Sequence, residues 1–309
     1  MKRYAQMLAL LLLAALLAGC GSAPQQPQDT DAAAGVTALP PEGITALTLS
    51  DANQVLRFRR GDGDTWYWQD DETFPLDQAG MPALLEAAAA MTASAPLEGA
   101  EELSAYGLDD ADTSLSVTAD GETLTFTRGD QAASGDWYLL CVEDGSVRLV
   151  SDDTIKVFQL LYGSIYDMAV LPALPSVTMD TLHTAAITGA DGTQVNLRVV
   201  DGVRKVGARD VTAETEALME ELSQLAVTAC VDYDPAEGAA AVCGLDAPEA
   251  VLTLTYDNAV GTEETLTVTV GLPIGDGGRY VTLSGDPTIY RMEESSLVQL
   301  LTLAETGLN

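Results

Sequence analysis

The sequence predicts an α+β protein of two tandem repeats, each an antiparallel meander of strands with two helices. A short motif occurs twice, as Tyr106-Gly107-Leu108-Asp109 and as Cys243-Gly244-Leu245-Asp246, with the two glycines 137 positions apart. After each motif come alternating apolar residues, a glycine and a tyrosine, which is Tyr138 in the first copy and Tyr280 in the second. Strands, helix, meander and helix follow in the same order twice, which favours segregated helices and strands over a wound parallel sheet.

The first repeat is expected to cover residues 43–163. Apolar and polar residues alternate in its strands, and Asp120-Gly121 and Asp144-Gly145 are typical tight hairpin turns. A helix is predicted around 81–91 from its apolar spacing, and a second over 152–162, capped by Ser151. The strands predicted here are 47–50, 56–59, 65–69, 114–119, 122–128, 136–142 and 146–150.

The second repeat is expected to cover residues 181–309, after a proline-containing linker at 164–180. A helix is predicted over 213–226 with Thr212 as its cap. The predicted strands are 182–188, 194–200, 203–206, 250–256, 264–270, 279–284 and 288–292. A last helix is expected to turn inward Leu297, Leu300, Leu301 and Ala304.

The amino-terminus has the order of a bacterial lipoprotein signal. Two basic residues precede an apolar stretch at 7–18, which is too short for a comfortable membrane span, and Leu17-Ala18-Gly19-Cys20 resembles a lipobox. We therefore expect residues 1–19 to be a signal peptide, Cys20 to carry the lipid, and 20–42 to be a flexible tether. The protein is expected to be extracytoplasmic and lipid-anchored to the cell membrane.

The charge balance is strongly acidic, with 47 Asp and Glu against 14 Lys and Arg and a net charge of −33. Such a chain repels nucleic acid and anionic lipid surfaces, both of which are bound through basic residues. Nucleic acid is therefore excluded as a partner. The acidity is typical of a soluble domain in a cation-rich exterior.

No motif assigns a catalytic, metal-binding or cofactor-binding residue. His183 is the only histidine and lies in a predicted strand, and a Gly-x-Ser-x-Gly elbow is absent. Zinc motifs with His-Glu-x-x-His or paired Cys-x-x-Cys are also absent. We expect a non-enzymatic protein that needs neither a metal nor a cofactor.

The cysteines and tryptophans leave alternatives open. Cys141 alternates with apolar neighbours and is expected to be buried. Cys230 and Cys243 form either a disulfide, which an extracytoplasmic protein permits, or two separate thiols. Trp66 and Trp68 project to one face of their predicted strand, where they either pack in the core or stack on a ligand.

The lipobox, the tether and the twice-used Gly-Leu-Asp pattern together resemble bacterial lipoproteins with the domain of unknown function 4340, and the resemblance covers residues 43–309. The resemblance implies a surface-anchored protein, with some relatives encoded beside ABC-type transporters, and gives no catalytic residue. We expect a binding or scaffold component, accessory to an ABC-type transporter or another envelope complex. The alternatives are a surface hydrolase and a glycan-binding module, each using a cleft between the repeats.

Overall fold

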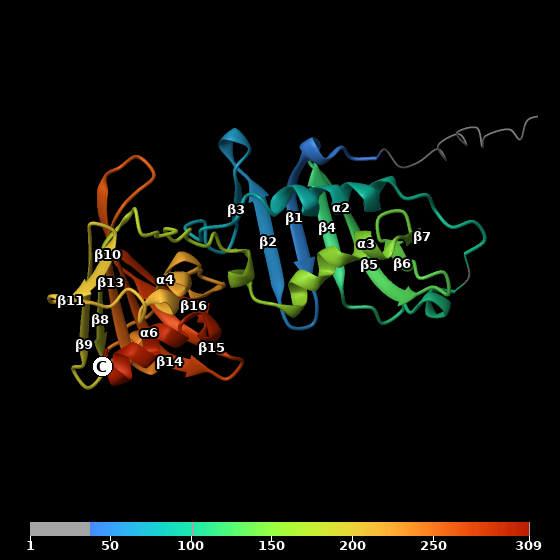
Figure 1. The fold of residues 1–309 in the computed structure, drawn as a ribbon. Helices are drawn as coiled ribbons and strands as arrows, with labels where there is room; N and C mark the ends of the chain where they lie inside the picture. The colour runs from blue at the N-terminus through green and yellow to red at the C-terminus, as the bar shows by residue number, and fades with distance from the viewer. Residues whose placement is uncertain (1–37, 101, 309) are drawn as a thin grey trace, which may run out of the picture. The chain divides into compact units, whose positions relative to one another are not determined.

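The computed structural model describes residues 38–100 and 102–308, and Figure 1 traces them as helices and strands. They form an α+β protein with two antiparallel sheets, as the sequence predicts. The predicted signal peptide at 1–19, the lipidated Cys20 and most of the tether at 20–42 lie outside the described residues.

The first sheet has seven strands in the order β3-β2-β1-β4-β5-β6-β7. Its strands are β1 (Ile44–Ser50), β2 (Val55–Arg60), β3 (Trp66–Trp68), β4 (Ser114–Ala119), β5 (Glu122–Gln131), β6 (Trp137–Cys141) and β7 (Ser146–Val150). Helix α2 (Met81–Ala93) follows β3, and α3 (Asp152–Ile155) continues into the 3-10 helix η4 (Lys156–Tyr162). The shorter 3-10 helices are η1 (Pro41–Gly43), η2 (Asp62–Asp64), η3 (Leu103–Tyr106) and η5 (Ile165–Met168).

The second sheet has nine strands in the order β11-β10-β9-β8-β13-β14-β15-β16-β12. Its strands are β8 (Leu182–Gly189), β9 (Gln194–Val200), β10 (Val203–Val206), β11 (Arg209–Asp210), β12 (Ala229–Asp232), β13 (Ala250–Asp257), β14 (Glu263–Ile274), β15 (Gly278–Leu283) and β16 (Asp286–Glu293). The helices here are α4 (Glu216–Ser223), α5 (Ala239–Val242), η6 (Glu294–Ser296) and α6 (Val298–Thr306).

Seven strands run in the same connection order in both sheets. In each sheet, the first three strands of the chain lie side by side, and a helix follows them. The next four strands then extend the sheet from the opposite edge of the first strand. The segment after that helix then returns to the last strand. It does so as an isolated bridge from Pro96 to Arg148 in the first sheet and as strand β12 beside β16 in the second.

The residue types in the tight turns between several strands explain the shape of these turns. Asp120 and Gly121 take φ values of 51° and 81°, and Asp201 and Gly202 take 54° and 73°. Both central residues of such a turn need the left-handed region, which Asp tolerates and Gly prefers. Asp-Gly between alternating strands therefore predicts these hairpins correctly.

Helix boundaries differ from the prediction at two places. The helix predicted over 213–226 is α4, which begins at Glu216, and the predicted cap Thr212 is used otherwise. The Thr212 hydroxyl accepts the backbone N–H of Arg204, and its carbonyl accepts the buried Arg204 guanidinium. The helix predicted over 152–162 does begin after Ser151, whose hydroxyl accepts the N–H of Thr154, but it tightens into η4.

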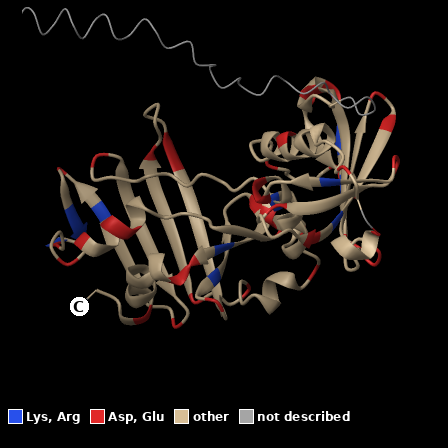
Figure 2. Ribbon diagram, turned by 90° about the vertical axis from the view of Figure 1, so that its right-hand side faces the viewer, with Lys and Arg blue, Asp and Glu red and all other residues tan. Residues whose placement is uncertain are grey.

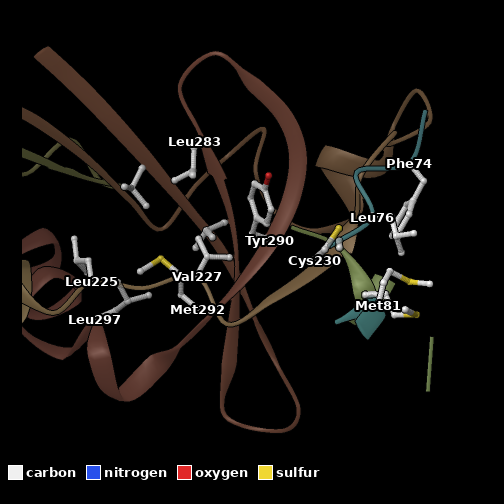
Figure 3. Packing of buried hydrophobic residues seen from close by; sticks show 14 of the residues in the cluster. Phe74, Leu76, Met81, Leu225, Val227, Cys230, Leu283, Tyr290, Met292 and Leu297 are labelled. Carbon is white, nitrogen blue, oxygen red and sulfur yellow. The ribbon is translucent and has the colours of Figure 1, made fainter. Parts of the chain in front are cut away.

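A single hydrophobic cluster contains buried residues of both sheets. Phe74, Leu76 and Met81 belong to the first half, and Cys230 and Tyr290 to the second, and Figure 3 shows these side chains in one view. The segment predicted as a linker at 164–180 takes part in this packing, because it begins with η5 and holds buried side chains of the shared core. Its backbone is tied to the loop after β3 by bonds from Asp77 to Met168 and from Val170 to Pro75.

Candidate functional site

The repeated Gly-Leu motif ends a helical turn in both halves. Gly107 and Gly244 have φ values of 66° and 71°, which favour glycine. The N–H of Leu108 bonds the carbonyl of Leu103 at 3.1 Å, and the N–H of Leu245 bonds the carbonyl of Ala240 at 2.8 Å. With the bonds donated by the two glycines, each motif is a Schellman cap, whose following residue is usually apolar. Both leucines are buried.

A second glycine in each half lies directly beneath this cap. A Cβ atom on Gly129 would lie 2.3 Å from the carbonyl oxygen of Tyr106, and one on Gly271 would lie 2.2 Å from that of Cys243. Neither glycine has a positive φ, so close backbone approach explains them. Asp109 and Asp246 are exposed, so the Gly-Leu-Asp motif serves the fold and offers no buried carboxylate for chemistry.

An aromatic cluster joins the two halves, and we call Phe74, Tyr166 and Tyr233 the aromatic junction. Phe74 and Tyr233 meet edge to face with ring centroids 5.2 Å apart, and Tyr166 lies 6.1 Å from Phe74 and 6.0 Å from Tyr233. The Tyr233 hydroxyl donates a hydrogen bond to Asp71. Rings at these separations are in direct contact, so the junction is packed and leaves no cage for a ligand.

The electrostatics of the aromatic junction are acidic. Burial raises the pKa of the Tyr166 phenol, and the nearby Asp232, Asp234 and Asp71 raise it further. The phenol therefore stays protonated throughout the neutral range, and its oxygen does not act as a nucleophile. The arrangement stabilises contact between the halves.

The tryptophans singled out in the sequence are placed in packing roles. Trp66 is 4% exposed, and its backbone N–H and carbonyl are both bonded by the Gln78 amide. Trp68 is half-buried and packs edge to face on Phe74 at 5.5 Å. Its indole N–H is buried without a hydrogen-bond partner. Neither indole lines the pockets that lie against α2, α4 and α6.

The cysteines are three separate thiols in the described residues. Cys141 is buried, as predicted. Cys230 lies in β12 and Cys243 just after α5, and both are free, so no disulfide joins them here. Burial raises the pKa of the Cys230 thiol to about 11, which keeps it protonated and unreactive. Thiol counting of the unreduced, unfolded protein tests this arrangement, because a bridge leaves Cys141 as the one free thiol of the three.

His183, on β8, pairs with acids on β13 and β14. Its Nε2 lies 3.0 Å from Asp257 and 4.0 Å from Glu263, and the side chain is 42% exposed. The hydrogen bond to Asp257 raises the pKa of the imidazole. A serine or cysteine hydroxyl or thiol beside the ring would be needed for nucleophilic catalysis, and no described contact supplies one.

The carboxyl group of Glu221 caps another helix. It accepts the backbone N–H groups of Gln299 at 2.7 Å and Leu300 at 2.9 Å, at the start of α6. Burial raises the pKa of Glu221, and these two bonds oppose the rise. Because the carboxylate already satisfies a helix terminus, it has a structural role.

A pocket of about 580 Å³ lies against α6, and we call it the α6 pocket. It is lined by Ala190, Asp191, Glu249, Arg279, Glu294, Val298, Leu301, Thr302, Ala304 and Glu305. Its volume is in the range of small-molecule sites, which run from about 300 to 1,000 Å³. Sequence reasoning missed it because its residues come from four separate segments, and only the tertiary structure brings them together.

Acidic groups outnumber basic ones over the described surface. All but one of the described lysines and arginines lie on strands, whereas the acidic residues of Figure 2 are spread over turns and strand ends. Most of the basic side chains are already in ion pairs. Among residues 38–100 and 102–308, no group of three or more His, Cys, Asp or Glu is placed to hold a metal ion.

These features define a class of protein: α+β, with two antiparallel sheets joined by one core and an aromatic junction. The chain belongs to the family described as Domain of unknown function (DUF4340), whose profile matches residues 66–243, more than half of the sequence. The matched segment runs from β3 to the second Gly-Leu motif and contains the whole aromatic junction.

No curated protein and no solved structure matches this chain. Within the part of the chain that the structure describes, no helix has both the length and the apolar character needed to cross a membrane.

Proposed function

We propose that this protein is a non-enzymatic, extracytoplasmic lipoprotein that acts as a binding or scaffold component of an envelope complex, such as an ABC-type transporter. Cys20 would carry the lipid anchor, and residues 20–42 would hold the folded part away from the membrane. The folded part would then present a fixed surface to its partner.

The observation that carries this proposal is the shared core. Residues of both sheets belong to one hydrophobic cluster, and the aromatic junction adds direct ring contacts between the halves. Halves that close around a ligand usually have separate cores and a small polar interface. A continuous core favours a rigid body, which suits a scaffold.

We also propose that the two halves are tandem repeats, at 43–163 and 181–309, joined by 164–180. The shared order of seven strands, the paired Schellman caps and the glycines at 129 and 271 support this interpretation. Duplication explains why the same two glycine positions recur at a close backbone contact.

The alternatives have less support. A glycan-binding module or a surface hydrolase would need exposed indoles beside a pocket, with an acid pair for the hydrolase. Trp66 is buried and Trp68 packs on Phe74. The Glu221 carboxyl group, whose pKa is raised, accepts hydrogen bonds from backbone N–H groups of α6.

Partner capture from membranes tests the proposal. The full chain is expressed in a lipoprotein-processing bacterium, cross-linked, extracted in detergent and purified with its neighbours. We expect a membrane protein to be recovered reproducibly, and recovery as a free monomer alone counts against a scaffold role.

A matched variant separates anchoring from partner binding. Cys20→Ser should move the protein from the detergent phase to the aqueous phase, while the folded part still captures its partner after solubilisation. Unchanged partitioning of Cys20→Ser contradicts lipidation at that residue.

A further inference from the structure

The α6 pocket has both apolar and charged lining residues. Helix α6 contributes the apolar residues Val298, Leu301 and Ala304. Arg279, from β15, is one of the charged residues. A pocket with an apolar wall and a few charged groups is suited to an amphipathic small molecule.

The charges in this pocket do not balance. Arg279 donates to Glu249 on one side and, from Nε at 2.9 Å, to Glu294 on the other. Asp191 and Glu305 also line the pocket, so four carboxylates and one guanidinium contribute to its lining, a formal balance of 1 − 4 = −3. Partly enclosed negative charge of this size attracts cations and repels anions.

The corresponding position in the first half is filled by side chains. Trp137 near the start of β6 and Arg279 near the start of β15 each bond an acid just beyond the next strand. The Trp137 indole N–H donates to Asp152 at 3.0 Å, as Arg279 does to Glu294. Strand register therefore places the indole and the guanidinium at equivalent points of the two sheets.

Arg128 completes the filling of the first half. Its guanidinium lies 5.5 Å from the centres of the Trp137 and Phe158 rings and donates to the Tyr162 hydroxyl at 3.1 Å. The second half has the buried Val270 at the position 142 residues after Arg128. The second half lacks this stack and has the α6 pocket there, whereas the first half has a packed cluster.

We propose that the α6 pocket binds a small organic cation, an amine or guanidinium compound with an apolar arm. The apolar arm would lie along α6, and the cationic group would meet carboxylates that Arg279 leaves without a full countercharge. Binding of such a cation is a function beyond the scaffold role, and it does not depend on the identity of a protein partner.

Three probes of equal length test the ligand class. Hexylammonium, hexanol and hexanoate are titrated separately into the soluble chain, residues 20–309 with Cys20→Ser, and followed by backbone amide shifts in NMR spectra. We expect hexylammonium to shift the amides of α6 and of the turn at Ala190-Asp191, with hexanol weaker and hexanoate without effect. Equal binding of the three, or tighter binding of hexanoate, overturns the proposal.

Paired substitutions locate the site. Glu305→Gln removes one lining carboxylate from the exposed side of α6, and Glu86→Gln removes an exposed carboxylate from α2. Glu305→Gln should weaken hexylammonium binding about threefold, in the range of exposed ion pairs, and Glu86→Gln should leave it unchanged. Equal losses in both variants mean attraction by the overall charge and contradict a site at α6.

A substitution that fills the α6 pocket gives a second control for the location of the binding site. Leu301→Trp places a bulky indole at a residue that lines the pocket, and it changes no charge. Binding of hexylammonium should be lost while the amide spectrum elsewhere keeps its native dispersion. Binding that persists in folded Leu301→Trp overturns the location.

Discussion

The two halves place different side chains at the same point of the same strand order. In the first half, the Arg128 guanidinium lies over the Trp137 and Phe158 rings. In the second half, Arg279 stands between Glu249 and Glu294 at the edge of a pocket. An aromatic ring buries apolar area and excludes water, whereas a guanidinium paired with carboxylates keeps the position hydrated. The comparison teaches that, within the same strand order, the side chains decide between a packed cluster and a pocket.

The grooves beside helices α2 and α4 show a second difference between the halves. Ala87 follows the buried Leu84 by three residues and lines a groove between α2 and η4. Glu221 follows the buried Leu218 by three residues and lines the groove between α4 and α6. The first groove is mainly apolar, whereas in the second the Glu221 carboxylate accepts backbone N–H groups at the start of α6.

The largest expected effect tests whether the two Gly-Leu caps are equivalent. Gly129→Ala and Gly271→Ala each drive a Cβ atom into a backbone carbonyl. Each should lower the free energy of unfolding by about 3 kcal/mol, as overpacking of a rigid site does. Urea unfolding followed by circular dichroism measures both losses, and a large loss in only one variant contradicts equivalent caps.

An open position gives the control for these glycines. Gly121 has a φ of 81°, and a Cβ atom added there would have no neighbouring atom within 4 Å. Gly121→Ala should cost about 1 kcal/mol from backbone conformation alone. A loss at Gly121 equal to that at Gly129 would show that steric contact is not the cause.

The aromatic junction gives the next effect, and it tests whether the halves unfold together. Tyr233→Ala removes ring contacts with Phe74 and Tyr166 and the bond to Asp71. We expect a loss of about 2 kcal/mol, less than for a fully buried aromatic residue because Tyr233 is half-buried. Scanning calorimetry should show one transition in the native chain and two in the variant.

A conservative change separates the ring from its hydroxyl. Tyr233→Phe keeps the ring contacts and loses only the hydrogen bond to Asp71. It should cost about 1 kcal/mol and keep a single transition. Two transitions in the native protein would contradict a core shared by both halves.

The helix cap gives a smaller effect that sharpens the comparison of grooves. Glu221→Ala leaves the first amides of α6 without their acceptor and should cost about 1 kcal/mol in urea unfolding. Ala87→Glu in the first half should give no gain, because α3 is already capped by Ser151. Stabilisation by Ala87→Glu would show that the first groove also lacks a cap.

The smallest effect is the pH dependence that His183 gives to the second half alone. Its pKa is raised in the folded state by Asp257, so the folded protein binds this proton more tightly than the unfolded chain. The stabilisation is therefore complete below the ordinary histidine pKa and is lost as pH rises through the folded value. Because proton binding and folding are linked in this way, the melting temperature should fall slightly over roughly pH 6 to 8.

Removal of the imidazole checks that assignment. His183→Gln should abolish the difference in melting temperature over this pH interval, while the remaining acidic groups keep their ordinary titration at lower pH. An unchanged slope in His183→Gln assigns the pH dependence to another group.

Much of the fold follows from local sequence. Alternating residues such as Leu115 and Val117 predict a half-buried strand, and Asp120-Gly121 predicts the hairpin that follows. Ser151 predicts a helix start for the same local reason. By contrast, β12 and α5 escape prediction, because Ala229–Asp232 and Ala239–Val242 are too short for a periodic pattern.

The candidate sites depended on contacts between distant segments. Sequence singled out Trp66 and Trp68, but packing on Phe74 and bonding by Gln78 gave them structural roles. Tyr233 was not singled out, since one tyrosine in an acidic loop has no distinguishing pattern, and its hydrogen-bond partner Asp71 lies 162 positions earlier. Spacing along a chain reports neighbours in a strand or helix and not partners across a core.

By itself, the sequence determined the α+β class, the strand order of each meander and membership of the family. These depend on alternation, turn chemistry and a motif, all of which act over a few residues. The tertiary structure alone decided that the two sheets share a core, that Trp137 packs under Arg128 in one half and that Arg279 borders a pocket in the other. Those outcomes depend on which side chains meet after folding, because burial and charge pairing are properties of the packed chain.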